Sequence, residues 1–193
     1  MILVKAGTDS PYLEMIERTN LEAFPPEERL PAAVQAAMCD KGELDLWAIC
    51  EGESYIGFTS VYKGVKTVYV FFLAIDSSCR SSGCGTRALG MIREAYPQRQ
   101  VVLDIEPLDP DAENAAQRSR RKGFYLRNAF HESGWLFKYC NMAFEVLWCG
   151  GDAFDRDSYW SLIQDIAVSV EAQGYRGFDP SMERLPGNPE AVD

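Results

Sequence analysis

Apolar residues in the first 75 positions switch between helical and extended spacing. Over residues 11–24 they recur every three or four positions, which predicts an amphipathic helix with Asp9 or Ser10 as its cap and Pro11 at its first position. The run at 66–75 is apolar at nearly every position, so we expect a central strand covered on both faces. The elements predicted for this half are strands at 2–6, 44–50, 54–62 and 66–75, and helices at 11–24 and 27–40.

The second half of the chain follows a glycine-rich turn with the same two spacings. Asp109 can cap a long helix that has Pro110 at its first position and runs to about Asn128. From residue 174 onward the chain is rich in Gly and Pro, which predicts a surface-hugging or loose tail. The other predicted elements are helices at 84–95 and 155–172, a strand at 101–106, and a hairpin of strands at 135–139 and 142–148.

This order of elements places antiparallel hairpins beside one βαβ unit at about 66–106. We therefore expect an α/β (α+β) fold with a mixed, mostly antiparallel central sheet of about seven strands, flanked by helices and followed by an extra C-terminal helix. The length of 193 residues suits one domain. The expected division is 1–150 as the main domain, with 151–193 as a helix and tail packed on it.

Composition and charge restrict the class of partner. No apolar run is long enough for a membrane span, and the first residues do not resemble a signal peptide, so we expect a soluble, cytoplasmic protein with no membrane partner. The net charge of −10 argues against nucleic acid. Residues 80–127 nevertheless hold nine Lys/Arg and six Asp/Glu, a balance of +3 against −13 for the rest, which suits an anionic ligand or an ordinary solvated helix. The six cysteines form no C-x-x-C pair and there is one histidine, so no metal site is expected.

The segment Arg80-Ser81-Ser82-Gly83-Cys84-Gly85-Thr86 carries the chemistry that is easiest to interpret. A glycine turn at a helix start directs several backbone N–H groups and the positive end of the helix dipole at one point. Glycine permits a positive φ there, and Arg80 can add a charged contact. The segment lacks the Lys-Ser or Lys-Thr of a Walker loop and the third glycine of a dinucleotide-binding fingerprint. On its own it indicates only an anion site.

The surroundings of this loop extend the interpretation. Residues 71–76, the loop, and Ala88, Leu89 and Ile92 after it resemble the acyl-CoA-binding motif of the GNAT acetyltransferase superfamily. Residues 114–130 resemble the same family's next helix, which ends Phe-Tyr-x-x-x-Gly-Phe, here Phe-Tyr-Leu-Arg-Asn-Ala-Phe. Residues 24–29 resemble a branch with bacterial members. The resemblance covers about residues 2–149 and implies an acetyl-CoA-dependent N-acetyltransferase without a metal.

The resemblance also implies a set of residues that bind coenzyme A. A strand bulged near its end would pair its backbone with the pantetheine arm, the loop amides would hold the pyrophosphate, and the long helix would line the groove. These residues are Leu73, Ala74, Ile75, Arg80, Ser81, Ser82, Gly83, Cys84, Gly85, Thr86, Asn114, Arg118 and Arg121. The two arginines, Arg118 and Arg121, could equally be solvated.

Acyl transfer to an amine requires an acid and a base. The resemblance implies Tyr125 as the acid, the alternative being a core aromatic beside Phe124. Asp104 and Glu106 alternate onto one face of the strand at 101–106, and either could be the base or could simply pair with an arginine of the long helix. Some members of this fold use only ordered water. Ala129 replaces the usual glycine, so Asn128 is expected to adopt the left-handed conformation.

The acceptor end of the site is less specified. Glu27 and Glu28 are candidates to contact the amine, which would be a small molecule or a peptide. The alternative function is a non-catalytic acyl-CoA-binding or interaction protein on the same fold. The helix at 155–172 either covers the sheet or forms a homodimer contact.

Overall fold

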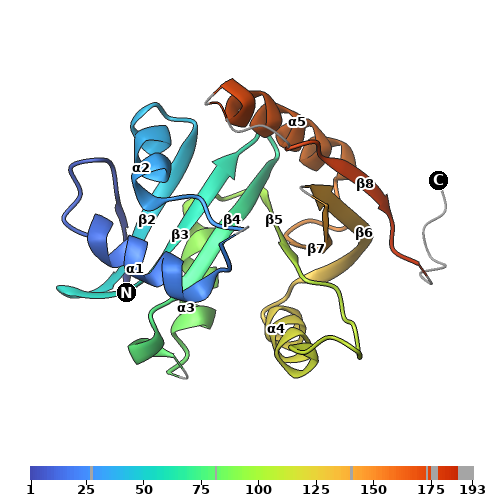
Figure 1. Cartoon of the computed structure of the whole chain (residues 1–193), viewed down its shortest axis with the longest axis horizontal. Coiled ribbons are helices and arrows are strands. Elements are labelled where there is room, and N and C mark those ends of the chain that lie inside the picture. The colour runs from blue at the N-terminus through green and yellow to red at the C-terminus, as the bar shows by residue number, and fades with distance from the viewer. Residues whose placement is uncertain (27, 81, 140, 173, 175–177, 187–193) are drawn as a thin grey trace. The chain divides into compact units, whose positions relative to one another are not determined.

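The computed structural model describes residues 1–26, 28–80, 82–139, 141–172, 174 and 178–186, coloured along the chain in Figure 1. The chain divides into two compact units, Met1–Lys63 with Val68–Pro97 and Gly64–Thr67 with Gln98–Asp193. Across the described residues the elements, in chain order, are β1 Ile2–Lys5, α1 Leu13–Ala23, α2 Ala32–Asp40, β2 Leu44–Glu51, β3 Ser54–Lys63, β4 Thr67–Ile75, the 3₁₀ helix η1 Ser77–Cys79, α3 Cys84–Ala95, β5 Gln100–Ile105, α4 Ala115–Arg127, β6 His131–Tyr139, β7 Met142–Cys149, α5 Arg156–Ala172 and β8 Ser181–Arg184.

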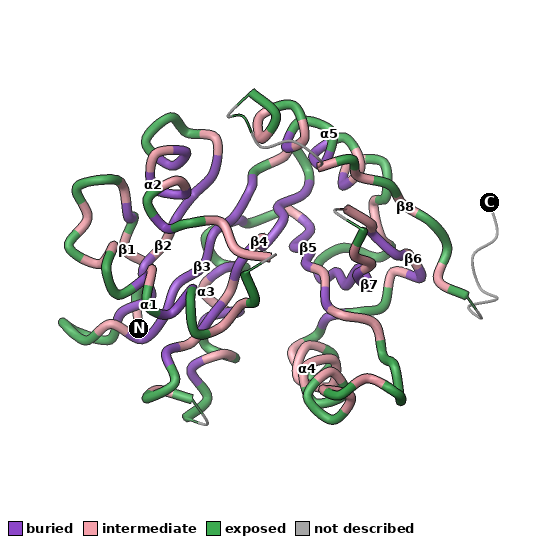
Figure 2. Tube along the Cα trace, in the orientation of Figure 1, coloured by how far each residue is buried: buried purple, intermediate pink, exposed green. Residues whose placement is uncertain are grey.

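The first unit is an antiparallel sheet with helices on both faces. Its strands pair in the order β1, β2, β3, β4. Helices α1 and α2 contact β3 and β2 on one face, where Phe24 lies 4.8 Å from Phe72 between ring centroids. On the other face α3 buries Ala88 against Ile49 and Ile56. Successive side chains of a strand point to opposite faces, and helices cover both faces of this sheet. Consecutive residues of β3 and β4 are therefore buried, as Figure 2 shows.

Strand β4 contains a bulge at Phe71. The register with β3 passes from Ser60↔Phe72 to Val61↔Val70, which leaves Phe71 without an opposite residue. The rings of Phe71 and Phe72 therefore approach to 4.2 Å although the residues are consecutive. The bulge lies in the middle of the strand rather than near its end.

The second unit is also an antiparallel sheet, with its strands paired in the order β5, β7, β6, β8. Strand β6 has a register shift between Glu132 and Leu136, where Gly134 adopts a φ of 75°. The shifted segment meets β8, because Leu185 donates its N–H to the Gly134 carbonyl at 2.9 Å. Helix α5 packs on this unit through Tyr159, whose ring lies 6.2 Å from that of Phe137.

The mixed α/β, mostly antiparallel fold class is confirmed, and several element boundaries differ from the prediction. The long helix α4 begins at Ala115 after Asn114, because Asp109 instead accepts the N–H of Asp111 in a separate turn. Residues 181–184 are a strand, not part of a loose tail, because they pair with 135–138 of β6. At the end of α4 it is Ala129, with a φ of 64°, that adopts the left-handed conformation, while Asn128 keeps a negative φ.

Candidate functional site

The glycine loop lies between β4 and α3, within the first unit. Asp76 ends the strand and caps η1 by accepting the N–H of Ser78 at 3.1 Å. The hydrogen bond from the Ser78 hydroxyl and the nearby Arg18 guanidinium, 3.0 Å away, lower the pKa of the Asp76 carboxyl despite its burial. The chain is therefore held firmly where it leaves the sheet, and the following loop starts from a fixed position.

Helix α3 begins immediately after Gly83. This residue has a φ of 76° and a ψ of 4°, a left-handed conformation in which glycine carries no steric penalty. The N–H groups of its first turn, at Cys84, Gly85 and Thr86, have no intrahelical acceptor, as in any α-helix. Within the described residues no side chain caps this helix in their place. The Ser82 hydroxyl instead bonds the Cys79 carbonyl at 2.7 Å and contacts the Cys84 thiol. The helix start is thus available for an anion.

Arg80 is folded back along this loop. Its Nε donates to the Ile75 carbonyl at 3.1 Å, and its Nη2 lies 3.6 Å from Glu22 Oε1 of α1. The guanidinium is therefore held at the end of β4. Ser81, also predicted to contact the pyrophosphate, lies outside the described residues.

The three strand residues predicted to face the cofactor differ in exposure. Ala74 is buried opposite Phe58 of β3. Leu73 and Ile75 are half-buried and pack against the apolar cluster that contains Cys84. Cys84 is thus a buried packing residue of the first turn of α3. The first unit brings the predicted strand residues and the loop together.

The predicted site residues that follow β4 and α3 in the chain belong to the second unit, where Glu106 is the centre of an ion-pair network. Its carboxylate lies 3.0 Å from Arg118 Nη2 and 2.8 Å from Arg121 Nη1. Asn114 donates to it at 3.0 Å and accepts from Arg118 Nε at 2.7 Å. This is the ion pairing that the sequence offered as the alternative to a base role for Glu106. All four residues are only partly exposed, so the network holds the start of α4 near the end of β5.

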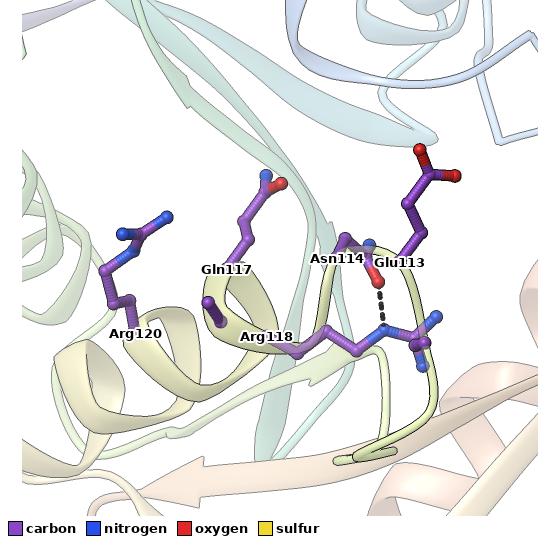
Figure 3. A pocket seen from close by; sticks show the side chains of 7 residues that line it. Glu113, Asn114, Gln117, Arg118 and Arg120 are labelled. Carbon is purple, nitrogen blue, oxygen red and sulfur yellow. Dashed lines mark hydrogen bonds between the residues drawn. The ribbon is translucent and has the colours of Figure 1, made fainter.

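An open depression of about 720 Å³ lies along the first turns of α4. Figure 3 shows the side chains of Gln117 and Arg120 projecting from α4 and that of Glu113 from the turn before it, with Arg118 turned toward Asn114. The residues that line it are Ala112, Glu113, Asn114, Ala116, Gln117, Arg118 and Arg120. Two of the predicted groove residues, Asn114 and Arg118, therefore do line a depression.

Tyr125 is half-buried near the end of α4, with its ring 5.2 Å from Phe124 and 5.5 Å from Phe130. Burial raises the pKa of its hydroxyl to about 12, Arg121 lowers it and the charge of Asp104 raises it. Asp104 is half-buried on β5 opposite Val146 of β7. The pKa effect indicates that the candidate acid and one candidate base are electrostatic neighbours.

One cluster was not anticipated from the sequence. Lys122 of α4 places its Nζ 2.8 and 2.9 Å from the two carboxylate oxygens of Glu145 and also pairs with Glu132. Glu145 is 1 % exposed. The available signal was the single charged residue in the otherwise apolar strand 142–149, because a buried carboxylate requires a partner.

Of the two residues predicted to contact the acceptor amine, the structure describes one. Glu27 lies outside the described residues. Glu28 is half-buried and donates its N–H to the Pro25 carbonyl in the turn after α1. In the described ranges no group of three or more His, Cys, Asp or Glu is placed to hold a metal ion. None of the helices in those ranges is long and apolar enough to cross a membrane.

The sequence matches the acetyltransferase (GNAT) family over residues 13–124. No curated protein gave a significant sequence match. Among solved structures, a protein from Bacteroides thetaiotaomicron assigned to the GNAT family superposes with a TM-score of 0.70 at 23 % identity, covering 91 % of this chain and 100 % of its own. An aminoglycoside 6'-N-acetyltransferase complexed with coenzyme A gives 0.61 at 16 % identity, covering 77 % and 96 %. The PaiA N-acetyltransferase from Thermoplasma acidophilum, also complexed with coenzyme A, gives 0.54 at 11 % identity, covering 78 % and 98 %.

Proposed function

Because the chain belongs to the GNAT family of acetyltransferases, we propose that it transfers the acetyl group of acetyl-CoA to a primary amine. The observation that carries this proposal is the start of α3, where the left-handed Gly83 leaves the amides of the first turn without a side-chain cap, at the position of the family's acyl-CoA motif. Two structural neighbours that carry coenzyme A support the choice of donor. We place the enzyme in the cytoplasm.

The amides of Ser82–Thr86 are proposed to bind the pyrophosphate, together with Ser81 and the Arg80 guanidinium. The backbone of β4 at Leu73, Ala74 and Ile75 is proposed to pair with the pantetheine arm. Asn114, Arg118 and Arg121 are proposed to line the groove, with Glu106 as the counterion that fixes their directions. This arrangement needs no metal.

In the proposed reaction the neutral amine attacks the thioester carbonyl carbon and forms the C–N bond. The tetrahedral intermediate then breaks its C–S bond, and the sulphur takes a proton from Tyr125. The acceptor nitrogen gives its extra proton to the base, and the tyrosinate recovers a proton from solvent. The raised pKa of about 12 keeps that hydroxyl protonated throughout the neutral range, so it is always in the donor form. Asp104 becomes the preferred base, because Glu106 is already bound by two guanidinium groups and an amide.

The acceptor is proposed to be a small-molecule or peptidic amine, contacted by Glu27 and Glu28. The balance of −13 outside residues 80–127 favours a cationic acceptor. The engagement of Glu106 by Arg118 and Arg121 also supports a second candidate function, a non-catalytic acyl-CoA-binding protein, because it removes one of the two possible bases.

The test is an acetyl-CoA turnover screen over polyamines, amino acids, aminoglycosides and peptide N-termini, followed by chromatography of the acetylated product. We expect turnover on at least one amine and a large loss of kcat in Tyr125→Phe with an unchanged Kd for acetyl-CoA. Asp104→Asn should flatten the acidic limb of the kcat/KM profile, where the rate rises with pH as the base loses its proton, more than Glu106→Gln does. Tight binding of acetyl-CoA without turnover on any amine would leave the binding protein as the better account.

A further inference from the structure

Glu22, near the C-terminal end of α1, is bound by both ends of the segment 77–80, whose last residue is the first of the glycine loop. Its Oε1 lies 3.6 Å from Arg80 Nη2, and its Oε2 accepts a hydrogen bond from the Ser77 hydroxyl at 3.1 Å. Side chains of Arg80 and Glu22 are 50 % and 42 % exposed, so both remain accessible to a ligand from solvent. All of these atoms belong to the first unit.

The position of this carboxylate is unfavourable for an anion site. Among the described residues of the loop, 80 and 82–86, Arg80 is the single cation, and Glu22 supplies a full negative charge beside it. A phosphate that approaches Arg80 therefore meets a competing anion. The guanidinium's other contact, from Nε to the Ile75 carbonyl, does not involve Glu22 and can keep Arg80 in place when Glu22 is displaced.

A second ion pair connects the same two elements. Arg18, four residues before Glu22 and therefore on the same side of α1, pairs with Asp76 at 3.0 Å. Helix α1 is thus attached to the β4–α3 segment through one pair at the end of the strand and another at the loop. Displacement of Glu22 would release the second attachment and leave the first.

We propose that Glu22 is an internal anion that occupies Arg80 in the unliganded protein and competes with the cofactor's phosphate for it, so that cofactor binding releases one of the two ion pairs between α1 and the β4–α3 segment. This inference rests on the proposed acetyl-CoA site. It assigns Glu22 a role that lowers cofactor affinity, the opposite of a residue that positions Arg80 for phosphate. It also links cofactor binding to α1, the helix that leads into the turn containing Glu28.

Calorimetric titration of acetyl-CoA into four variants tests the proposal. Glu22→Gln removes the charge, keeps the shape and can still accept from Ser77. We expect it to bind acetyl-CoA about 1.4- to five-fold more tightly than wild type, since exposed ion pairs contribute about 0.2–1 kcal/mol. Glu14→Gln, an exposed residue in the first turn of the same helix, controls for net charge and should leave Kd unchanged. In an Arg80→Gln background, adding Glu22→Gln should give a markedly smaller gain.

The outcomes separate the inference from the proposed function. Weaker or unchanged binding by Glu22→Gln, or the same gain with and without Arg80, overturns the role of Glu22 while the acetyl-CoA site stands. A gain that depends on Arg80 and is absent in Glu14→Gln supports it. If wild-type protein and all variants fail to bind acetyl-CoA, the proposed function itself is wrong.

Discussion

Replacing Lys122 by Met should strongly destabilise the protein, because it leaves a buried carboxylate without its cation. Lys122 Nζ contacts both oxygens of Glu145 at 2.8 and 2.9 Å, and the two side chains are 13 % and 2 % exposed. Removing one partner of such a buried pair costs about 3–5 kcal/mol, whereas a surface pair contributes about 0–1 kcal/mol. We expect a loss of about 3 kcal/mol in the free energy of unfolding at neutral pH. This is the lower end of that range, because the neighbouring Glu132 is half-exposed and water can reach the cluster beside it.

The loss should depend on pH with a definite sign. Burial raises the pKa of Glu145 above its usual range, and Lys122 opposes this shift. Without Lys122 the folded-state pKa should rise further. A carboxyl with a raised folded pKa contributes stability that is fully present below its unfolded pKa and is lost as the pH rises through the folded value. The penalty of Lys122→Met should therefore be smaller near pH 4.5 than at pH 7, around the unfolded glutamate value of about 4.3.

Urea unfolding followed by circular dichroism at the two pH values measures this prediction. The matched control is Lys122→Met combined with Glu145→Gln, which removes the uncompensated charge and should recover most of the lost stability at pH 7. A penalty under about 1 kcal/mol at pH 7, or one that is equal at both pH values, would refute the reasoning, since either result is typical of an exposed pair.

Three further predictions concern other parts of the chain. Gly83→Ala should lose about 1–2 kcal/mol of stability in urea unfolding, because its φ of 76° disfavours a Cβ although no atom lies within 4 Å of one; an unchanged midpoint would contradict this. Burial opposes ionisation of Asp45, but hydrogen bonds from Lys63 and Tyr96 outweigh it and lower its pKa. NMR should therefore show that Asp45 titrates below the unperturbed aspartate value of about 3.9. Its stabilising effect should be lost as the pH falls from that value through the lower pKa of the folded state. Trp135→Ala should remove its two cation–π contacts, with Arg156 and Arg184, and speed amide exchange selectively in β8. A uniform change along the chain would argue against a local stabilisation of β8 by Trp135.

The sequence predicts best those elements whose signals are local. The prediction for α3 coincides with its bounds at 84–95, because a glycine turn and a clear helical period mark the same point. The start of α4 was placed too early, because Asp109-Pro110 has the composition of a helix start but forms a separate turn. Strand β8 carries no alternating apolar pattern, and its contacts include the pairing with β6 and the stacking of Arg184 on Trp135.

The same distinction applies to the candidate site. The left-handed turn at Gly83 follows from its residue type, because glycine adopts a positive φ without a steric penalty. The partners of Glu106 do not follow from the sequence alone. Strand alternation places Asp104 and Glu106 on one face, but it does not say which of the two carboxylates meets the arginines of α4. The ion pair between Glu22 and Arg80 joins residues 58 positions apart, and no local pattern predicts it.

Amide hydrogen–deuterium exchange can detect whether the loop at the start of α3 binds the pyrophosphate of acetyl-CoA. With and without saturating acetyl-CoA, exchange would be followed by mass spectrometry on peptides that cover β4, the loop and the first turn of α3. We expect slower exchange on binding at residues 82–86 and 73–75. Binding of acetyl-CoA with unchanged exchange in both segments would show that the pyrophosphate does not bind at this loop.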